Sequence, residues 1–157
     1  MLTAIQKKVL KQVVQTLKEH EIKFQITGGL AAIIYGGKRP LFDIDLDVLK
    51  KDIEKVREIF KKYIIKDFHR HQSEYFDIWI MTLKINDVLV DISQGEDCSM
   101  RNKKGEWVKM DTDLSHPTLV NFEGMELTVE PKNELTNYKK VLRRDSDLVD
   151  IDQLADL

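Results

Sequence analysis

The sequence predicts an α+β protein, in which helices pack on a mixed β-sheet within a single compact domain that ends in C-terminal helices. Helical and strand-like segments alternate in the first half of the chain. The middle is rich in short β-type segments, and helical patterns return after residue 130. A length of 157 residues suits one hydrophobic core, so we expect one domain over residues 1–157.

The composition is that of a globular protein, with 42% hydrophobic and 33% charged residues. No segment approaches the ~18 uncharged apolar residues that a membrane span needs, and the N-terminus lacks a signal peptide. Cys98 is the only cysteine, which excludes an internal disulfide and fits a reducing compartment. We therefore expect a cytoplasmic protein without a membrane partner. The net charge of −2 gives no strongly basic surface, so we expect no nucleic-acid partner.

The N-terminal segment predicts a helix, then a strand, then a second helix. Residues 3–20 carry apolar side chains on one helical face, at Ile5, Val9, Val13 and Leu17. Thr3 and Gln6 have the spacing of a capping box at the start of this helix. Residues 22–27 then predict a short strand, and residues 30–35 predict a helix between two pairs of glycines.

Residues 42–49, FDIDLDVL, give the clearest strand signal, because Asp alternates with large apolar side chains. A second amphipathic helix follows, whose inward positions are Ile53, Val56, Phe60 and Tyr63. Residues 75–85 and 88–93 flank Asn86-Asp87, so they predict a β-hairpin. His69 and His71 have an i, i+2 spacing that could bind a metal if they lay on a strand. They fall in a polar segment before this hairpin, where we instead expect a loop with surface histidines.

The C-terminal part predicts two more short strands and two helices. The strands are expected around Trp107–Met110 and Met125–Val129, with loops rich in Asp, Ser and Pro between them. Pro131 opens a helix that reaches roughly Arg144, and Asp145 caps the last helix.

Asp43, Asp45 and Asp47 raise an electrostatic question, because alternate residues of a strand project to the same side. Neighbouring carboxylates would then lie roughly 6.7 Å apart and repel by about 2.5 kcal/mol at an effective dielectric near 20. Either the row faces open water on an edge strand, or a cation lies beside it. Asp91, in VLVDIS, supplies a third ligand if its strand lies next to 42–49, and is otherwise a strand-end acid near the surface.

Gly28-Gly29 connects a predicted strand to a predicted helix, which brings backbone N–H groups to the sheet edge. Alone, this pair indicates no more than a turn. Followed by carboxylates on the next strand, it suits a phosphoryl-type transfer that uses two metal ions ~3.5–4 Å apart. Arg39 precedes the acidic strand and is either a phosphate contact or an exposed loop residue.

These residues resemble the DNA polymerase β-like nucleotidyltransferase superfamily. Its signature is an apolar residue, Gly, then Gly or Ser, a helix-length spacer, and Asp-apolar-Asp/Glu-apolar. Here it reads Ile26-Thr27-Gly28-Gly29, thirteen residues, then Asp43-Ile44-Asp45-Leu46. The third family carboxylate maps to Asp91, and Gly29 stands where the family often has Ser.

The C-terminal segment 133–154 looks like that of small stand-alone members related to antibiotic nucleotidyltransferases and to abortive-infection or toxin–antitoxin proteins. The residues at the shared positions are Tyr138, Lys139, Arg144, Asp147 and Asp150. By this similarity, Lys139 and Arg144 would face a triphosphate, whereas the alternative is a basic helix end that complements the helix dipole.

The resemblance implies a nucleotidyltransferase-like domain that moves a nucleoside monophosphate from a nucleoside triphosphate, with ATP as the expected donor, to a hydroxyl of a small molecule or protein. Asp43, Asp45 and Asp91 would be catalytic and would hold Mg²⁺ or Mn²⁺, and Gly28 and Gly29 would hold the phosphates. The alternative is a non-catalytic nucleotide-binding or toxin–antitoxin component with the same fold. Asp47 is additional to the family pattern. It either shares the metal face and alters the site or lies past the edge in solvent, and we expect the second. The sequence does not identify the acceptor or the oligomeric state.

Overall fold

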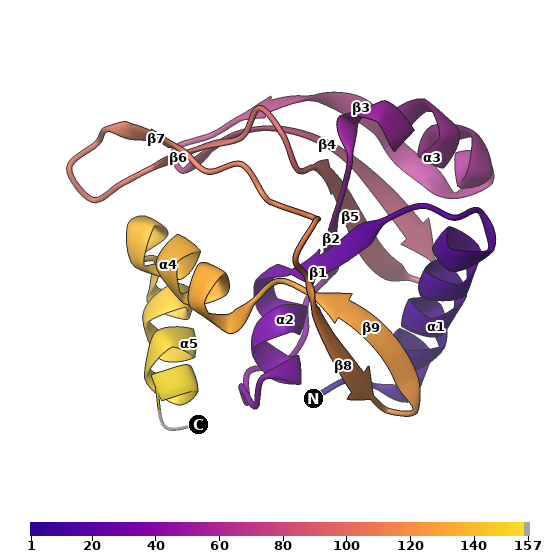
Figure 1. Cartoon of the computed structure of the whole chain (residues 1–157), viewed down its shortest axis with the longest axis horizontal. Helices are drawn as coiled ribbons and strands as arrows, with labels where there is room; N and C mark the ends of the chain where they lie inside the picture. The colour runs from indigo at the N-terminus through magenta and orange to yellow at the C-terminus, as the bar shows by residue number, and fades with distance from the viewer. Residues whose placement is uncertain (156–157) are drawn as a thin grey trace.

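The structure, a computed structural model, describes residues 1–155 and consists of one β-sheet with helices packed on it (Figure 1). The strands are β1 (Phe24–Thr27), β2 (Ile44–Val48), β3 (Ile64–Gln72), β4 (Phe76–Ile85), β5 (Val88–Gln94), β6 (Ser99–Arg101), β7 (Trp107–Lys109), β8 (Thr118–Phe122) and β9 (Met125–Val129). The helices are α1 (Ala4–Glu19), α2 (Gly28–Ile34), α3 (Ile53–Ile59), α4 (Lys132–Leu142) and α5 (Asp145–Ala155), with short 3₁₀ turns at Lys50–Asp52 and Lys61–Tyr63. This arrangement confirms the predicted mixed α+β class.

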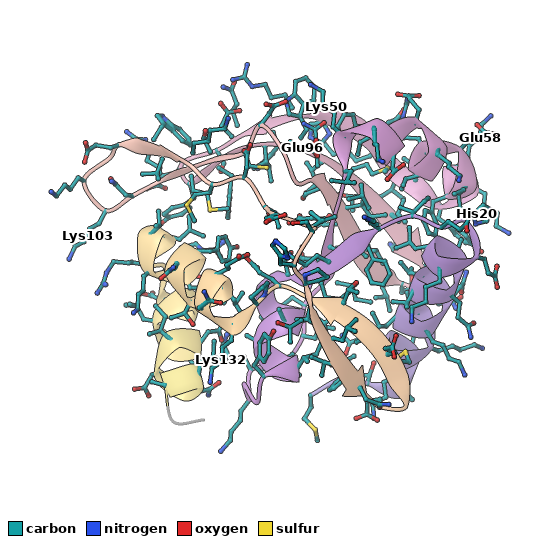
Figure 2. The ribbon with its side chains drawn as sticks, viewed as in Figure 1. His20, Lys50, Glu58, Glu96, Lys103 and Lys132 are labelled. Atoms are coloured by element: carbon teal, nitrogen blue, oxygen red, sulfur yellow. The ribbon has the colours of Figure 1, made fainter. Side chains whose placement is uncertain are left out.

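The strand order is β7-β6-β4-β5-β2-β1-β9-β8, and β3 pairs with β4 outside this path. At the centre, β2 is antiparallel to β1 and parallel to β5, while β1 is parallel to β9. The backbone N–H of Lys50, after β2, donates to Glu96 Oε1, after β5, at 2.7 Å, and Figure 2 shows the two residues next to each other. The parallel pair β2–β5 therefore brings two distant segments of the chain side by side.

Four of the five helices lie at the two ends of the molecule, and α2 lies between them (Figure 1). α1 and α3 lie at one end, while α4 and α5 lie side by side at the other, beneath the extended β6–β7 hairpin. Among the described residues, no helix has the length and apolar character that crossing a bilayer requires.

The first helix forms largely as the sequence predicts. Thr3 and Gln6 make the reciprocal capping box, and Val9, Val13 and Leu17 are buried in the core. Ile5 was expected on the same buried face, but it is 55% exposed. The hairpin of β4 and β5 is also confirmed, and its turn residues Asn86 and Asp87 both have positive φ.

Three strands were not predicted, namely β3, β6 and β8. His69 and His71 lie in β3 rather than in a loop, and both are half-buried rather than fully exposed. β3 pairs only with β4, with interruptions in its register, so most of its side chains face solvent and their sequence shows no alternation. The prediction was therefore wrong where a strand has no buried face.

Candidate active site

Three carboxylates meet at the centre of the sheet, on strands β2 and β5. The parallel register places Asp45 directly opposite Asp91, and Asp43 precedes β2 on the same side. One carboxylate oxygen from each of Asp43, Asp45 and Asp91 lies within 4.8 Å of the others. The sequence-based expectation that the strand of Asp91 lies next to residues 42–49 is therefore confirmed. We call these three residues the acid triad.

The acid triad is electrostatically unfavourable without a counter-charge. Burial, with the charge of Asp91, raises the pKa of Asp43 to about 6. Burial and the neighbouring Asp43 and Asp91 hold the pKa of Asp45 well above its usual value. Thr82 Oγ1 donates to Asp91 Oδ1 at 2.6 Å and so fixes one side of the triad. Hard oxygen ligands this close together fit a divalent cation such as Mg²⁺ or Mn²⁺.

The two glycines of the turn after β1 differ in what surrounds them. Gly28 has φ +63°, and a Cβ there would lie 2.6 Å from Asp45 Oδ2. At Gly29, a Cβ would meet nothing closer than Arg39 Nη2, at 3.8 Å. Gly28 is therefore required for the close approach of the turn to Asp45, whereas position 29 has room for a small side chain.

Five charged residues form a second group, which we call the ion-pair cluster: Arg39, Lys139, Arg144, Asp147 and Asp150. Arg39 donates two hydrogen bonds of 2.7 Å to Asp150, which also pairs with Lys139 Nζ at 2.8 Å. Lys139 Nζ is 3.7 Å from Asp147, and Arg144 donates to Asp147 at 2.7 Å and 3.1 Å. The cluster joins the loop before β2 to α4 and α5.

The predicted cations are thus close to the acid triad but paired with acids of their own. Lys139 is 1% exposed and lies between Asp147 and Asp150, whereas the side chains of Arg39 and Arg144 are 23% and 30% exposed. Hydrogen bonding to Asp150 raises the pKa of Arg39, so its guanidinium stays charged. All the predicted site residues, namely Gly28, Gly29, Arg39, Asp43, Asp45, Asp91, Lys139 and Arg144, line one cavity of about 750 Å³.

Asp47 does not lie in solvent as expected. It is 9% exposed, and Thr112 Oγ1 donates to its Oδ2 at 2.8 Å. Burial raises its pKa to about 6. The expectation was wrong because the segment after β7 crosses the end of β2, where the N–H of Thr112 also bonds to the carbonyl of Gly95. Asp47 lines the cavity but does not belong to the acid triad.

Sequence reasoning missed Glu130, which lines the same cavity and is only 8% exposed. Burial, with the charges of Asp47 and Glu134, raises its pKa to about 8, against an opposing effect of Lys139. The sequence signal for Glu130 was its place directly after the strand segment MELTV. It follows Thr128 by two residues, so the two side chains project from the same strand face.

The far wall of the cavity is largely apolar. It comes from the extended half of the sheet, through His71, Phe76, Ile78, Ile80 and Met100. His71 had been expected on the surface, but cross-strand pairing with Ile78 turns it toward this wall. The cavity therefore combines a polar floor, where the acid triad lies, with an apolar side.

Comparison of the sequence with protein families gives one match over nearly the whole chain. The family described as aminoglycoside-2''-adenylyltransferase matches residues 9–154. No curated protein sequence matches significantly.

Solved structures similar to this chain agree on the fold. A protein from Thermotoga maritima that is assigned as a nucleotidyltransferase aligns with a TM-score of 0.75 and 22% identity, over 100% of this chain and 97% of its own. The lincosamide antibiotic adenylyltransferase LnuA, bound to lincomycin, aligns with a TM-score of 0.64 and 18% identity, over 94% and 95%. ANT(2'')-Ia, in complex with adenylyl-2''-tobramycin, aligns with a TM-score of 0.65 and 12% identity, over 98% and 89%. The predicted nucleotidyltransferase-like fold is therefore confirmed.

Proposed function

The chain belongs to the aminoglycoside-2''-adenylyltransferase family, and from this membership we propose that it transfers a nucleoside monophosphate from a nucleoside triphosphate to a hydroxyl group of a small molecule. ATP is the proposed donor, because the family and two of the similar structures are named for adenylyl transfer. A cavity of about 750 Å³ is within the range of small-molecule sites, which supports a small acceptor over a protein. A cytoplasmic location, where triphosphates are abundant, is part of this proposal.

The observation that carries the proposal is the acid triad beside the Gly28 turn. Asp43, Asp45 and Asp91 would hold Mg²⁺ or Mn²⁺, and the raised pKa values of Asp43 and Asp45 are a reason for a cation to bind there. Bound divalent ions would neutralise charge on the transferring phosphoryl group and lower the pKa of the acceptor hydroxyl.

The side chains of the cavity have complementary roles in this proposal. Asp91, oriented by Thr82, would accept the proton of the acceptor hydroxyl as it attacks the α-phosphorus. The N–H groups of the turn at Gly28 and Gly29 would contact the phosphates. Arg39 Nη1 donates to no partner among the described residues and is available to donate to a phosphate oxygen, since Nε and Nη2 donate to Asp150.

Lys139 and Arg144 would contribute positive charge on the same side of the cavity. The ion-pair cluster contains three cations and two acids, so it has a net charge of +1 next to the proposed phosphate site. Because Lys139 is almost fully enclosed, its proposed contribution is to the local potential and to the position of Arg39 through Asp150.

Two measurements test the proposal together. Calorimetry with Mg²⁺ and each nucleoside triphosphate reports binding, and labelled triphosphate mixed with tobramycin or lincomycin reports transfer and pyrophosphate release. Binding of ATP with nucleotidylation of an acceptor supports the enzyme. Tight binding without pyrophosphate release, including with a cell extract as acceptor source, would favour the non-catalytic or toxin–antitoxin alternative. The absence of any triphosphate binding would contradict both functions.

A further inference from the structure

Glu130 is a buried acid of the cavity that the proposed mechanism does not use. It follows β9, and its backbone is fixed on both sides, since its N–H donates to Ile26 at 2.9 Å and its carbonyl accepts from Tyr35 Oη at 2.7 Å. Its side chain is directed into the cavity, yet the carboxyl group accepts no hydrogen bond from the described residues. A buried carboxyl group on a fixed backbone, without a hydrogen-bond partner of its own, is available to a ligand.

The sheet register gives its position relative to the acid triad. β9 pairs with β1 at Ile26 and Val129, so Glu130 lies beside Thr27, which in turn pairs with Asp45. Asp45 pairs with Asp91 on the next strand. With adjacent strands roughly 4.8 Å apart, the backbone of Glu130 is about 10 Å from that of Asp45, on the side opposite Asp91. The turn at Gly28 lies between Glu130 and the acid triad.

Asp91 and Glu130 thus lie on opposite sides of Asp45, which matches the two sides of an in-line displacement. The attacking and leaving oxygens lie on opposite sides of the transferred phosphorus. If the hydroxyl attacks from the side of Asp91, the pyrophosphate departs toward the Gly28 turn and Glu130.

The groups around Glu130 come from three elements, and they favour its neutral form. Asp47 on β2 and Glu134 on α4 repel a negative charge there, while Lys139 on α4 is attracted to it. The phenols of Tyr35, at the C-terminal cap of α2, and of Tyr138 on α4 also face it and are neutral, because burial raises the pKa of both. Burial is the largest effect, and with the acidic neighbours it raises the pKa of Glu130 to about 8. The carboxyl group is therefore mostly protonated at pH 7 and can lie next to a polyphosphate without repelling it.

We propose that Glu130 is the general acid of the reaction and donates its proton to the departing pyrophosphate. The proposal depends on the proposed nucleotidyl transfer and adds the leaving-group side to it. The acceptor oxygen bonds to the α-phosphorus as the bond from that phosphorus to the α,β-bridging oxygen breaks. The electron pair of the broken bond remains on that oxygen, now part of pyrophosphate, which takes the Glu130 proton. The hydroxyl proton goes to Asp91 or to solvent, and solvent reprotonates Glu130.

Proton uptake on binding tests the position of Glu130 without any acceptor. A triphosphate near Glu130 raises its pKa further, so binding of Mg²⁺ with α,β-methylene-ATP at about pH 8.5 takes up a proton. Calorimetry in buffers of different ionisation enthalpy measures this uptake. We expect uptake by the wild type and by Glu126→Gln, which changes an exposed glutamate of the adjoining strand β9, but not by Glu130→Gln. Equal uptake in all three proteins would overturn the inference.

Leaving-group dependence tests the proton transfer itself. Glu130→Gln keeps the shape of a neutral carboxyl group, so we expect it to fold and bind triphosphate normally but to release pyrophosphate roughly 10²-fold more slowly. The wild-type rate should fall as the pH rises through about 8, and the variant should lack this fall. The loss of rate in Glu130→Gln should be smaller with β,γ-difluoromethylene-ATP than with β,γ-methylene-ATP, because the leaving group of the difluoro analogue is less basic.

The outcomes separate this inference from the proposed function. Normal triphosphate binding and wild-type pyrophosphate release in Glu130→Gln would overturn the acid role and leave the proposed function intact. A wild-type protein that binds no triphosphate would overturn both.

Discussion

The acid triad and the ion-pair cluster line the same cavity, but the charges of the triad are unpaired whereas those of the cluster are paired. Asp43, Asp45 and Asp91 come together with no paired cation among the described residues, and the pKa values of Asp43 and Asp45 are raised. In the ion-pair cluster, burial opposes the charge of Asp150, but hydrogen bonds from Arg39 and Lys139 outweigh it and lower its pKa. The cluster satisfies its own charges, whereas the triad needs a charge from outside the chain.

This difference indicates what each region contributes. Repulsion within the acid triad costs folding free energy that a bound cation recovers, so the triad is organised for a ligand rather than for stability. The ion-pair cluster is fully connected and buried at its centre, so loss of one acid would leave a cation unpaired. Mutations in the two regions should therefore separate activity from stability.

The largest expected effect is on activity, from Asp45→Asn in the acid triad. Removing this carboxylate should lower nucleotidyl transfer by about 10³-fold or more, roughly 4 kcal/mol of barrier, because the proposed metal site loses a central ligand. Stability should be unchanged or higher, since a repelling charge is removed. Transfer assays and urea unfolding measure the two effects. Asp52→Asn, which changes a half-buried aspartate outside the acid triad that makes no side-chain cap hydrogen bond to α3, is the matched control. An unchanged transfer rate in Asp45→Asn would contradict the proposed metal-dependent mechanism.

The opposite pattern is expected from Asp150→Asn in the ion-pair cluster. Lys139 would keep only Asp147, at 3.7 Å, and Arg39 would lose both of its 2.7 Å hydrogen bonds. Leaving buried cations without their partner should destabilise the fold by about 3–5 kcal/mol in urea unfolding. Asp152→Asn, on the exposed face of α5, should change stability by less than about 0.5 kcal/mol. Equal midpoints for both variants would show that the cluster does not stabilise the fold.

The sequence predicted the acid triad better than the ion-pair cluster, and the reason is locality. Asp43 and Asp45 are two residues apart on a strand with a strong alternation, and Asp91 lies in another clear strand, so only one pairing was needed to join them. Arg39 meets Asp150 across 111 residues, through the packing of a loop on α5. No periodicity encodes such a contact, so the residues could be identified but not their pairing.

Burial of polar side chains was the other feature that the sequence did not reveal. Asp47 and Glu130 look like strand-end acids, but chain segments distant in sequence cover both. β8 likewise has alternate exposed residues and is recognisable mainly through its pairing with β9. Elements with one clear buried face were predicted, and those whose environment is set by distant segments were not.

A pair of glycine variants sharpens the comparison at the edge of the acid triad. Gly28→Ala must hold φ +63° and approach Asp45 Oδ2 to 2.6 Å, so we expect a loss of about 1–3 kcal/mol in stability and a weakened response to Mg²⁺. Gly29→Ala has room and should change stability by less than about 0.5 kcal/mol. Thermal unfolding with and without Mg²⁺ measures both. Equal behaviour of the two variants would contradict the close contact between the turn and the triad.

The smallest expected effect is on the pH dependence of stability, where the two regions respond with opposite sign. Asp43 has a folded-state pKa of about 6, above its unfolded value, so the folded protein binds more protons between about pH 4 and 6. Without metal, stability should therefore rise as the pH falls from 7 to 5, by about 1–2 kcal/mol after allowance for partial exposure.

The lowered pKa of Asp150 acts in the other direction, because its contribution is present above about pH 4 and is lost as the pH falls further. Urea unfolding of the metal-free protein from pH 7 to 3 should thus show a maximum near pH 5. Asp45→Asn should make the limb above the maximum less steep without removing it, because the raised pKa values of Asp47 and Glu130 also contribute there, and Asp150→Asn should make the limb below it less steep. Saturating Mg²⁺ should also make the upper limb less steep, because a bound cation replaces the protons that relieve repulsion within the triad. A stability that falls steadily from pH 7 to 5 without metal would mean that the three carboxylates do not repel one another in solution.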